Sequence, residues 1–216
     1  PLKNLLQEAF GSLDLGKVSK PLLIPAVDIT KGKPYVYRAG IPCEKQEVPV
    51  KLWDAVLSSC SAPVYFPPND VEGRYLSVDG GLWANNPSLA SVVEAIHSFG
   101  LSLKEIEVIS IGTGKQNIDF VKSASTGWGI GSWLPVRLKA MRVVPKILDL
   151  AMDISSEAVS YHCRLLLGDN YFRVNRELGR EMSFDEVEDA YSLIEYGKET
   201  FSDQKEEIFR HLRINR

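Results

Sequence analysis

A strand-to-helix transition around residue 79 constrains the fold of this chain more than any other feature. Residues 74–78 alternate in the manner of a strand and run directly into Asp79-Gly80-Gly81. Asn86-Pro87 then opens a helix, because asparagine can cap it and proline at its first position costs no hydrogen bond. A passage from strand through a glycine turn into a helix is typical of α/β folds.

Segments with strand-like and helix-like patterns alternate along the rest of the chain. The helix after Asn86 is expected to turn Ala90, Val93 and Ile96 toward the core. Apolar spacing predicts further helices at 1–10, 50–62, 137–167 and 183–212. Pro145 should break the third of these, and Ser183 with Glu186 forms a capping box at the start of the fourth. Strands are predicted at 21–27 and 35–38, paired as a hairpin, and at 106–111 and 171–174.

Composition excludes several classes of protein. The chain has 216 residues, 44% hydrophobic and 25% charged, with a formal net charge of -3, so binding to nucleic acid or another polyanion is not expected. The longest apolar runs fall far short of the roughly 20 residues that a membrane span needs. The three cysteines, Cys43, Cys60 and Cys163, are odd in number and widely spaced, which favours reduced thiols in a cytoplasmic location.

The stretch from residue 58 to residue 90 carries the candidate chemistry. An acidic residue at the carboxyl end of a strand lies where open α/β sheets place their ligands. The glycines after it have no Cβ, so backbone or substrate can come close to the carboxylate. Asp79 could therefore act as a general base for a hydroxyl nucleophile. Asp-Gly is also a common turn dipeptide, so a purely structural turn is the alternative when this dipeptide is taken alone.

The order of motifs in this stretch and beyond it resembles the patatin-like phospholipase family. The motifs are SxxAPxYFPP from residue 59, Asp79-Gly80-Gly81, ANNPS from residue 84, and ISIGTG from residue 109. The resemblance implies an α/β fold with a mainly parallel sheet and helices on both faces, in three layers. Residues 1–216 would be the C-terminal portion of one such domain, incomplete at its N-terminus.

The resemblance also implies a reaction, hydrolysis of lipid acyl esters by a serine–aspartate dyad with neither metal nor organic cofactor. Asp79 would be the general base, in a site loop with Gly80, Gly81, Asn85 and Asn86, although helix capping is the simpler role for Asn86. The family's serine belongs to a Gly-x-Ser-x-Gly elbow, and no serine of this chain has both flanking glycines. We therefore expect the nucleophile upstream of these residues and the 216-residue chain alone to be inactive.

Other candidates have plain structural alternatives. Cys60 could be a nucleophile, but a small buried residue at a helix end is the simpler reading. Ser58, Ser59 and Ser61 could replace the missing serine, and helix-end capping explains them equally well. Gly112-Thr113-Gly114-Lys115 resembles a phosphate loop but lacks its upstream glycine, which favours a turn after a strand. The competing functional class is a non-catalytic patatin-like module that binds lipid or a protein partner.

A basic stretch that contains two tryptophans suggests a second partner in addition to the lipid substrate, namely the surface of a membrane. Tryptophan rings suit the headgroup level of a bilayer, and nearby cations suit anionic lipid. The alternative is a glycine-rich loop whose tryptophans pack on the core, followed by a helix with a solvated basic face. The residues concerned are Trp128, Trp133, Arg137, Lys139, Arg142 and Lys146.

Overall fold

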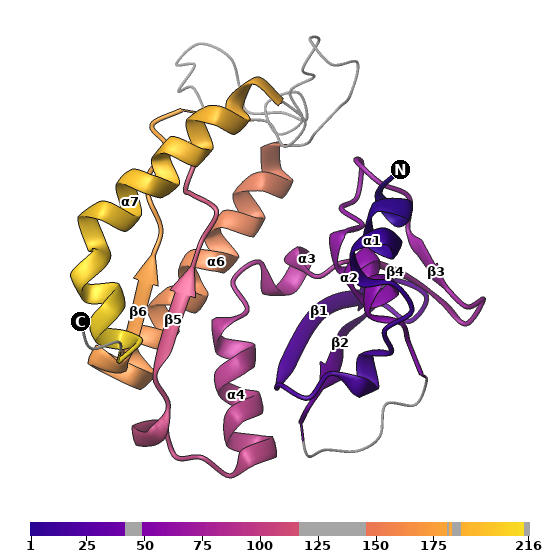
Figure 1. The fold of residues 1–216 in the computed structure, drawn as a ribbon, viewed down its shortest axis with the longest axis horizontal. Coiled ribbons are helices and arrows are strands. Elements are labelled where there is room, and N and C mark those ends of the chain that lie inside the picture. Colours follow the sequence, from indigo (N-terminus) through magenta and orange to yellow (C-terminus); the bar gives the residue numbers. More distant parts are fainter. Residues whose placement is uncertain (42–48, 117–145, 181, 183–186, 214–216) are drawn as a thin grey trace, which may run out of the picture. The chain divides into compact units, whose positions relative to one another are not determined.

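The computed structural model describes residues 1–41, 49–116, 146–180, 182 and 187–213. These residues form two compact units (Figure 1). Unit 1 contains the described residues of Pro1–Leu101, and unit 2 contains those of 102–213. The single domain expected over residues 1–216 stays a prediction, and each unit is described by itself.

Unit 1 is built on a four-stranded sheet in the order β2-β1-β4-β3. The strands are β1 (Leu22–Asp28), β2 (Lys33–Ala39), β3 (Asn69–Val71) and β4 (Tyr75–Asp79). The predicted hairpin is confirmed, because β1 and β2 pair antiparallel from Leu22↔Ala39 to Asp28↔Lys33. β4 pairs antiparallel with β1 through Ala26↔Asp79, so the last residue of β4 lies against the middle of the sheet.

Helices cover this sheet and enclose the core of unit 1. They are α1 (Leu2–Phe10), α2 (Leu52–Cys60), the short α3 (Gly81–Ala84) and α4 (Ser88–Phe99), with a 3-10 turn at Leu15–Lys17. Between the hairpin and α2 lies an apolar cluster that includes the fully buried Leu15, Ala26, Tyr37, Ala55 and Val71. The predicted first helix and its end at Gly11 are confirmed.

The phase predicted for α4 is wrong. Val93 and Ile96 are 56% and 40% exposed, whereas Val92 is 2% exposed and packs inward. Apolar residues occupy both sides of this helix, so their spacing did not distinguish its inward from its outward face. Figure 1 shows α4 as the longest helix of unit 1, following directly on the short α3.

Unit 2 contains two parallel strands and two long helices. The strands are β5 (Val108–Ile111) and β6 (Tyr171–Val174), and the helices are α6 (Lys146–Leu167) and α7 (Ala190–His211). Short 3-10 turns lie at Leu103–Glu105, Gly168–Asn170 and Val187–Asp189. α6 begins directly after Pro145, where the sequence predicts a break. Ser183 and Glu186, the predicted capping box, lie outside the described residues.

The expected mainly parallel sheet is not what the described strands form. β1–β2, β1–β4 and β3–β4 are antiparallel, and β5–β6 is parallel. Apolar runs predict that strands exist but not the direction of their neighbours, and here a tight turn makes the first pair antiparallel. The architecture is therefore mixed α/β. No described helix is long and apolar enough to cross a bilayer.

Candidate functional site

Asp79 ends β4 at the point where the chain leaves the sheet. Its backbone N–H donates to the carbonyl oxygen of Ser61 at 3.1 Å, which ties the residue to the segment that follows α2. Its side chain is half-buried. Sheet pairing with Ala26 on one side and the Ser61 contact on the other fix the backbone from which the carboxylate projects.

The two glycines after Asp79 are required by close packing. A Cβ on Gly80 would overlap the carbonyl group of Pro25 in β1, so only glycine lets the turn lie against that strand. A Cβ on Gly81 would lie 3.0 Å from Oδ1 of Asp79 and would crowd the carboxylate. The Asp-Gly-Gly sequence therefore lets the chain turn sharply while leaving space beside the acid.

One oxygen of the Asp79 carboxylate is held by a backbone hydrogen bond. Oδ1 accepts the Gly81 N–H at 2.6 Å, and within the described chain this is the one hydrogen bond to the carboxylate. Burial raises the pKa of Asp79, and the Gly81 N–H only partly offsets that rise. A carboxylate whose pKa is raised is a stronger base than an exposed one, and its Oδ2 can receive a proton.

Two contacts that the sequence did not predict anchor the turn to β1. The indole Nε1 of Trp83, in α3, donates to the carbonyl of Ala26 at 2.9 Å. The hydroxyl of Ser59, near the end of α2, donates to the carbonyl of Pro25 at 2.7 Å. Both carbonyls belong to the part of β1 where its pairing with β4 ends. Nothing in the local sequence pattern signals which side chains would fill these positions.

The two asparagines of the site loop take different positions. Asn86 is buried, and its Oδ1 accepts both the N–H of Ser88 at 3.1 Å and the Ser88 hydroxyl at 2.6 Å. This supports the helix-opening role, with α4 beginning at Ser88, one residue later than predicted. Asn85 is exposed, and its Oδ1 would lie 3.5 Å from a Cβ on Gly81, so the amide shares the space above Gly81 with the Asp79 carboxylate.

Cys60 differs from its expected buried position, because the residue is exposed at the end of α2. Its thiol nevertheless lies against neighbouring atoms close to Asp79. Partial burial of the sulfur, and then the Asp79 charge, raise the pKa of Cys60. Both effects disfavour the thiolate, so Cys60 is a poor nucleophile near neutral pH.

The three nearby serines all have structural hydrogen bonds. Ser58 is fully buried and accepts hydrogen bonds from Tyr37 and Asn69. Ser61 is also buried and bonds back to the carbonyl of Leu57, the pattern of a helix end. Together with the Ser59 contact to β1, these bonds favour the structural reading of all three hydroxyls.

Gly112 and Gly114 form a turn at the carboxyl end of β5, as the alternative to a phosphate loop predicts. The N–H of Gly112 donates to the carbonyl of Val174 at 2.8 Å, and the N–H of Gly114 donates to Oδ1 of Asn175 at 2.9 Å. A Cβ on Gly112 would overlap the Asn175 side chain. The two N–H groups that a phosphate would need are therefore already bonded within the protein.

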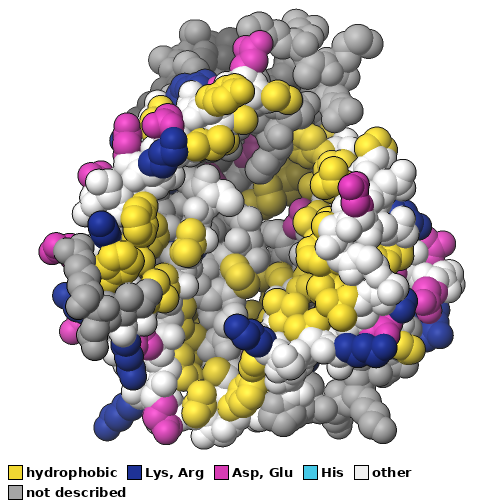
Figure 2. Space-filling model, viewed as in Figure 1, with side chains coloured by type: hydrophobic (Ala, Val, Ile, Leu, Met, Phe, Trp, Pro, Cys, Tyr) yellow, Lys and Arg dark blue, Asp and Glu magenta, His cyan; other side chains and the backbone are white. Residues whose placement is uncertain are grey.

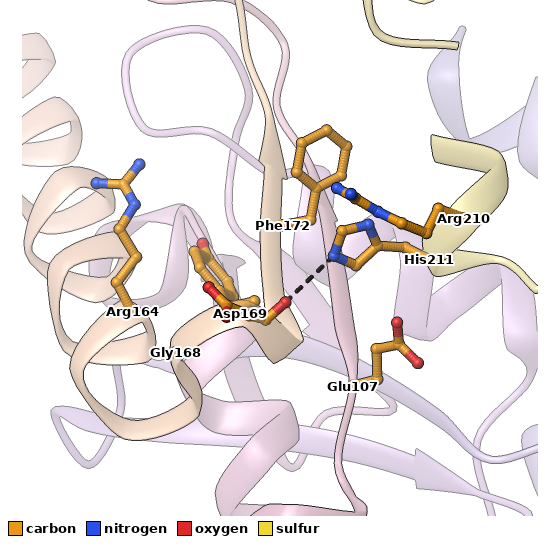
Figure 3. Close-up of a pocket in the computed structure, with 8 residues that line it drawn as sticks. Glu107, Arg164, Gly168, Asp169, Phe172, Arg210 and His211 are labelled. Atoms are coloured by element: carbon orange, nitrogen blue, oxygen red, sulfur yellow. Dashed lines mark hydrogen bonds between the residues drawn. The ribbon is translucent and has the colours of Figure 1, made fainter. Parts of the chain in front are cut away.

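A cavity of about 810 Å³ in unit 2 lies at the amino ends of β5 and β6 (Figure 3). Arg164 lies near the end of α6, and Arg210 and His211 end α7, so these groups complement the negative ends of two helices. His211 stacks on Phe172 and lies 3.3 Å from the Asp169 carbonyl. The basic groups that line the cavity thus have a structural explanation. Open α/β sheets bind their ligands at the carboxyl ends of the strands, whereas this cavity lies at the amino ends.

The remaining predicted residues cannot be placed. Trp128, Trp133, Arg137, Lys139 and Arg142 lie outside the described residues, and so does the side chain of Lys146. Within the described chain, no group of three or more histidine, cysteine or acidic side chains could hold a metal ion.

Comparison with known proteins tests the resemblance that the motifs indicate. Residues 1–90 match the model of the patatin-like phospholipase family. The predicted resemblance to patatin-like phospholipases is confirmed. The chain is 28% identical over 200 residues to "Patatin-like protein 1" of Arabidopsis thaliana, a match that covers 81% of the chain and 47% of that protein.

Several relatives are named as phospholipases, and two of them are described here. The first is a "cGAMP-activated phospholipase" of Pseudomonas aeruginosa, 29% identical over 190 residues, with 85% of this chain and 53% of that protein covered. The second is the "85/88 kDa calcium-independent phospholipase A2" of Rattus norvegicus, 34% identical over 158 residues, with 64% of this chain and 18% of that protein covered. The chain spans about half or less of the length of its patatin-like relatives.

Proposed function

We propose that this chain is part of a lipid acyl hydrolase in which Asp79 is the general base. The half-buried Asp79 carboxylate carries the proposal, since it is held on Oδ1 by Gly81 and its pKa is raised by burial. The family match over residues 1–90 and the relatives named as phospholipases support a lipid ester as the substrate class. Asn85, beside the same glycine, is proposed to orient the loop.

The proposed reaction is acyl transfer through a covalent intermediate. Oδ2 of Asp79 takes the proton of a serine hydroxyl as its oxygen bonds to the ester carbonyl carbon. The ester C–O bond then breaks, and the leaving alkoxide takes the proton from Asp79. Water, deprotonated by the same carboxylate, attacks the carbonyl carbon of the acyl-enzyme. The bond between the acyl carbon and the serine oxygen breaks, the serine oxygen takes the proton back from Asp79, and the fatty acid is released. Two groups suffice, because a carboxylate close to the hydroxyl performs the role that histidine has in a triad.

The nucleophile is proposed to come from outside these 216 residues. No serine of the chain lies in a Gly-x-Ser-x-Gly sequence, and Ser58, Ser59 and Ser61 are all engaged in structural hydrogen bonds. The chain by itself is therefore proposed to be catalytically incomplete. A non-catalytic module that binds lipid would contain the same residues, and the following experiment separates the two.

The experiment treats the longer protein that carries this chain with a fluorophosphonate probe and locates the adduct by peptide mass spectrometry. We expect one labelled serine, outside the 216 residues, and hydrolysis of phosphatidylcholine that the probe abolishes. An adduct on a serine of this chain would contradict the assignment of the nucleophile. No adduct and no hydrolysis would instead support the non-catalytic module.

A further inference from the structure

The short helix α3 depends on its contacts with the sheet, and Trp83 provides a specific one. α3 has four residues, Gly81–Ala84, and a helix of one turn is not stable by itself. The indole N–H of Trp83 bonds to the carbonyl of Ala26 in β1 at 2.9 Å. Ala84 is buried but has only a methyl group. Leu82 is 39% exposed, one of the hydrophobic side chains that reach the surface in several patches on this protein (Figure 2), and contributes little to holding the helix.

The first residue of the same turn holds the Asp79 carboxylate. The N–H of Gly81 donates to Oδ1 of Asp79 at 2.6 Å. The carbonyl of Gly80 accepts the backbone N–H groups of Trp83 and Ala84 at 3.1 and 2.9 Å, so residues 80–84 form one hydrogen-bonded turn. The position of the Gly81 N–H therefore follows the position of α3, and a shift of this helix would lengthen the bond to the carboxylate.

The bond from Trp83 closes a ring of contacts around the acid. Ala26, whose carbonyl accepts the indole N–H, is also the residue of β1 that pairs with Asp79. The chain thus leaves Ala26 at Asp79, turns through Gly80 and Gly81, and returns to Ala26 at Trp83. Gly80 allows this path, because a Cβ there would overlap the carbonyl group of Pro25. The ring fixes both ends of the segment that carries the carboxylate and its hydrogen-bond donor.

A purely structural role for Trp83 is the alternative. The side chain is half-buried, and a buried indole N–H usually finds an acceptor for its own sake. The two roles differ in what they affect. A structural contact changes only the stability of the fold, whereas a contact that places the Gly81 N–H also changes the proton affinity and the direction of the Asp79 carboxylate.

We propose that Trp83 is a positioning residue for the general base, because its bond to Ala26 keeps α3 and the Gly81 N–H in place against Asp79. The inference rests on the proposed function, in which the ionised carboxylate must point at a serine hydroxyl. With Oδ1 held, Oδ2 keeps one direction, and small errors of alignment are costly in catalysis. The Gly81 N–H lowers the pKa of Asp79 against the larger effect of burial, so loss of that bond would raise the pKa further.

The test compares Trp83→Phe with Trp53→Phe in the longer protein that carries this chain. Trp83→Phe keeps an aromatic ring without the N–H, so kcat for lipid ester hydrolysis should fall about tenfold or more with KM unchanged. The acidic limb of its kcat/KM profile should move to higher pH by roughly half a unit or more. Trp53, the half-buried tryptophan of α2 beneath Lys3, is the matched control, with a change below twofold and an unmoved limb expected. Equal losses in both variants, or an unmoved limb in Trp83→Phe, would overturn the proposal.

A second measurement does not depend on catalysis. Hydrogen exchange of a peptide covering residues 79–85, followed by mass spectrometry, should be about tenfold faster in Trp83→Phe than in the unaltered protein. A 3-benzothienylalanine at position 83 keeps the shape of the indole and has sulfur in place of the N–H, so it should give the same increase. Unchanged exchange with this analogue would overturn the proposal. An Asp79→Asn protein that stays active would instead refute the proposed function, while the exchange still reports on the Trp83 contact.

Discussion

At the scale of single residues, unit 1 keeps a connected set of polar side chains beneath its sheet. Tyr37 donates to Ser58 at 3.0 Å, and the amide of Asn69 donates to Ser58 at 2.9 Å and to Oδ1 of Asp54 at 2.8 Å. Burial raises the pKa of Asp54, and the bond from Asn69 only partly offsets it. The folded state therefore binds a proton at Asp54 more tightly than the unfolded state does.

Because its pKa is raised, the ionised Asp54 lowers the free energy of unfolding at neutral pH. A raised pKa means that stability is highest below the unfolded value and declines as the pH rises through the folded value. Asp54→Asn keeps the acceptor for Asn69 and removes the charge, so the free energy of unfolding at pH 7 should rise and its pH dependence should weaken. Urea denaturation between pH 4 and 8 measures both. Glu8→Gln, on exposed α1, should change neither, and an equal rise there would refute the assignment.

The Asp-Gly-Gly turn provides a steric prediction. Gly80→Ala should destabilise the protein by about 3 kcal/mol, because its new methyl group would overlap the Pro25 carbonyl and push β4 away from β1. Gly16→Ala is the matched control, since open space surrounds Gly16 and its φ is not positive. Thermal or urea unfolding of the two variants makes the comparison, and a cost below about 0.5 kcal/mol for Gly80→Ala would contradict the packing.

Residue chemistry was predictable where it is local. The sequence indicates an acid followed by two glycines and an asparagine that opens a helix, and the structure has Gly80 packed on β1 and Asn86 bonded to Ser88. The sequence did not indicate the positive φ of Val64 or the exposure of Cys60, because both depend on the path of the chain at the end of α2 and in the loop after it. The catalytic role of Asp79 remains a prediction.

At the scale of elements, the hairpin is joined to α4 by an ion pair. Nε and Nη2 of Arg38, on β2, both lie 3.0 Å from Oε2 of Glu94. Burial acts to raise the pKa of Glu94, but hydrogen bonds from Ser98 and Arg38 outweigh it, so the pKa is lowered. A lowered pKa means that this pair stabilises the fold above the unfolded value and loses its effect as the pH falls.

A double-mutant cycle tests this connection. Arg38→Met and Glu94→Gln should show a coupling of about 0.5–1 kcal/mol at pH 7, measured by urea unfolding, because Glu94 is largely shielded from water while Arg38 is partly exposed. Lys198 and Glu195, both exposed on α7, form the control pair, with about 0.3 kcal/mol expected. A coupling between Arg38 and Glu94 no larger than the control would contradict the account.

The sequence predicted elements better than it predicted their arrangement. The hairpin, α2, β4 and β6 were all predicted near their observed positions, because turn residues and prolines limit them locally. β3 was missed, since three residues in a proline-rich loop show no alternation. The face of α4 and the direction of strand pairing were wrong, because both depend on contacts distant in the sequence.

At the scale of the whole molecule, the proposed hydrolysis depends on the ionisation of one half-buried acid, Asp79. The general base must be ionised to accept a proton, and burial raises the pKa of Asp79. As the pH falls, hydrolysis should therefore be lost at a higher pH than the ordinary pKa of an aspartate would predict. The acidic limb of a kcat/KM profile measures this, and a limb within the ordinary aspartate range would contradict the burial argument.

The most direct test of the central claim is the rate of lipid ester hydrolysis after Asp79→Asn in the longer protein that carries this chain. The account predicts a loss of kcat/KM of about a thousandfold or more, with the fold retained, because amide oxygen accepts the Gly81 N–H but cannot take the serine proton. Asp70→Asn, at the exposed position of β3, should lose less than twofold. An Asp79→Asn protein that keeps a tenth or more of the activity would remove Asp79 from the mechanism.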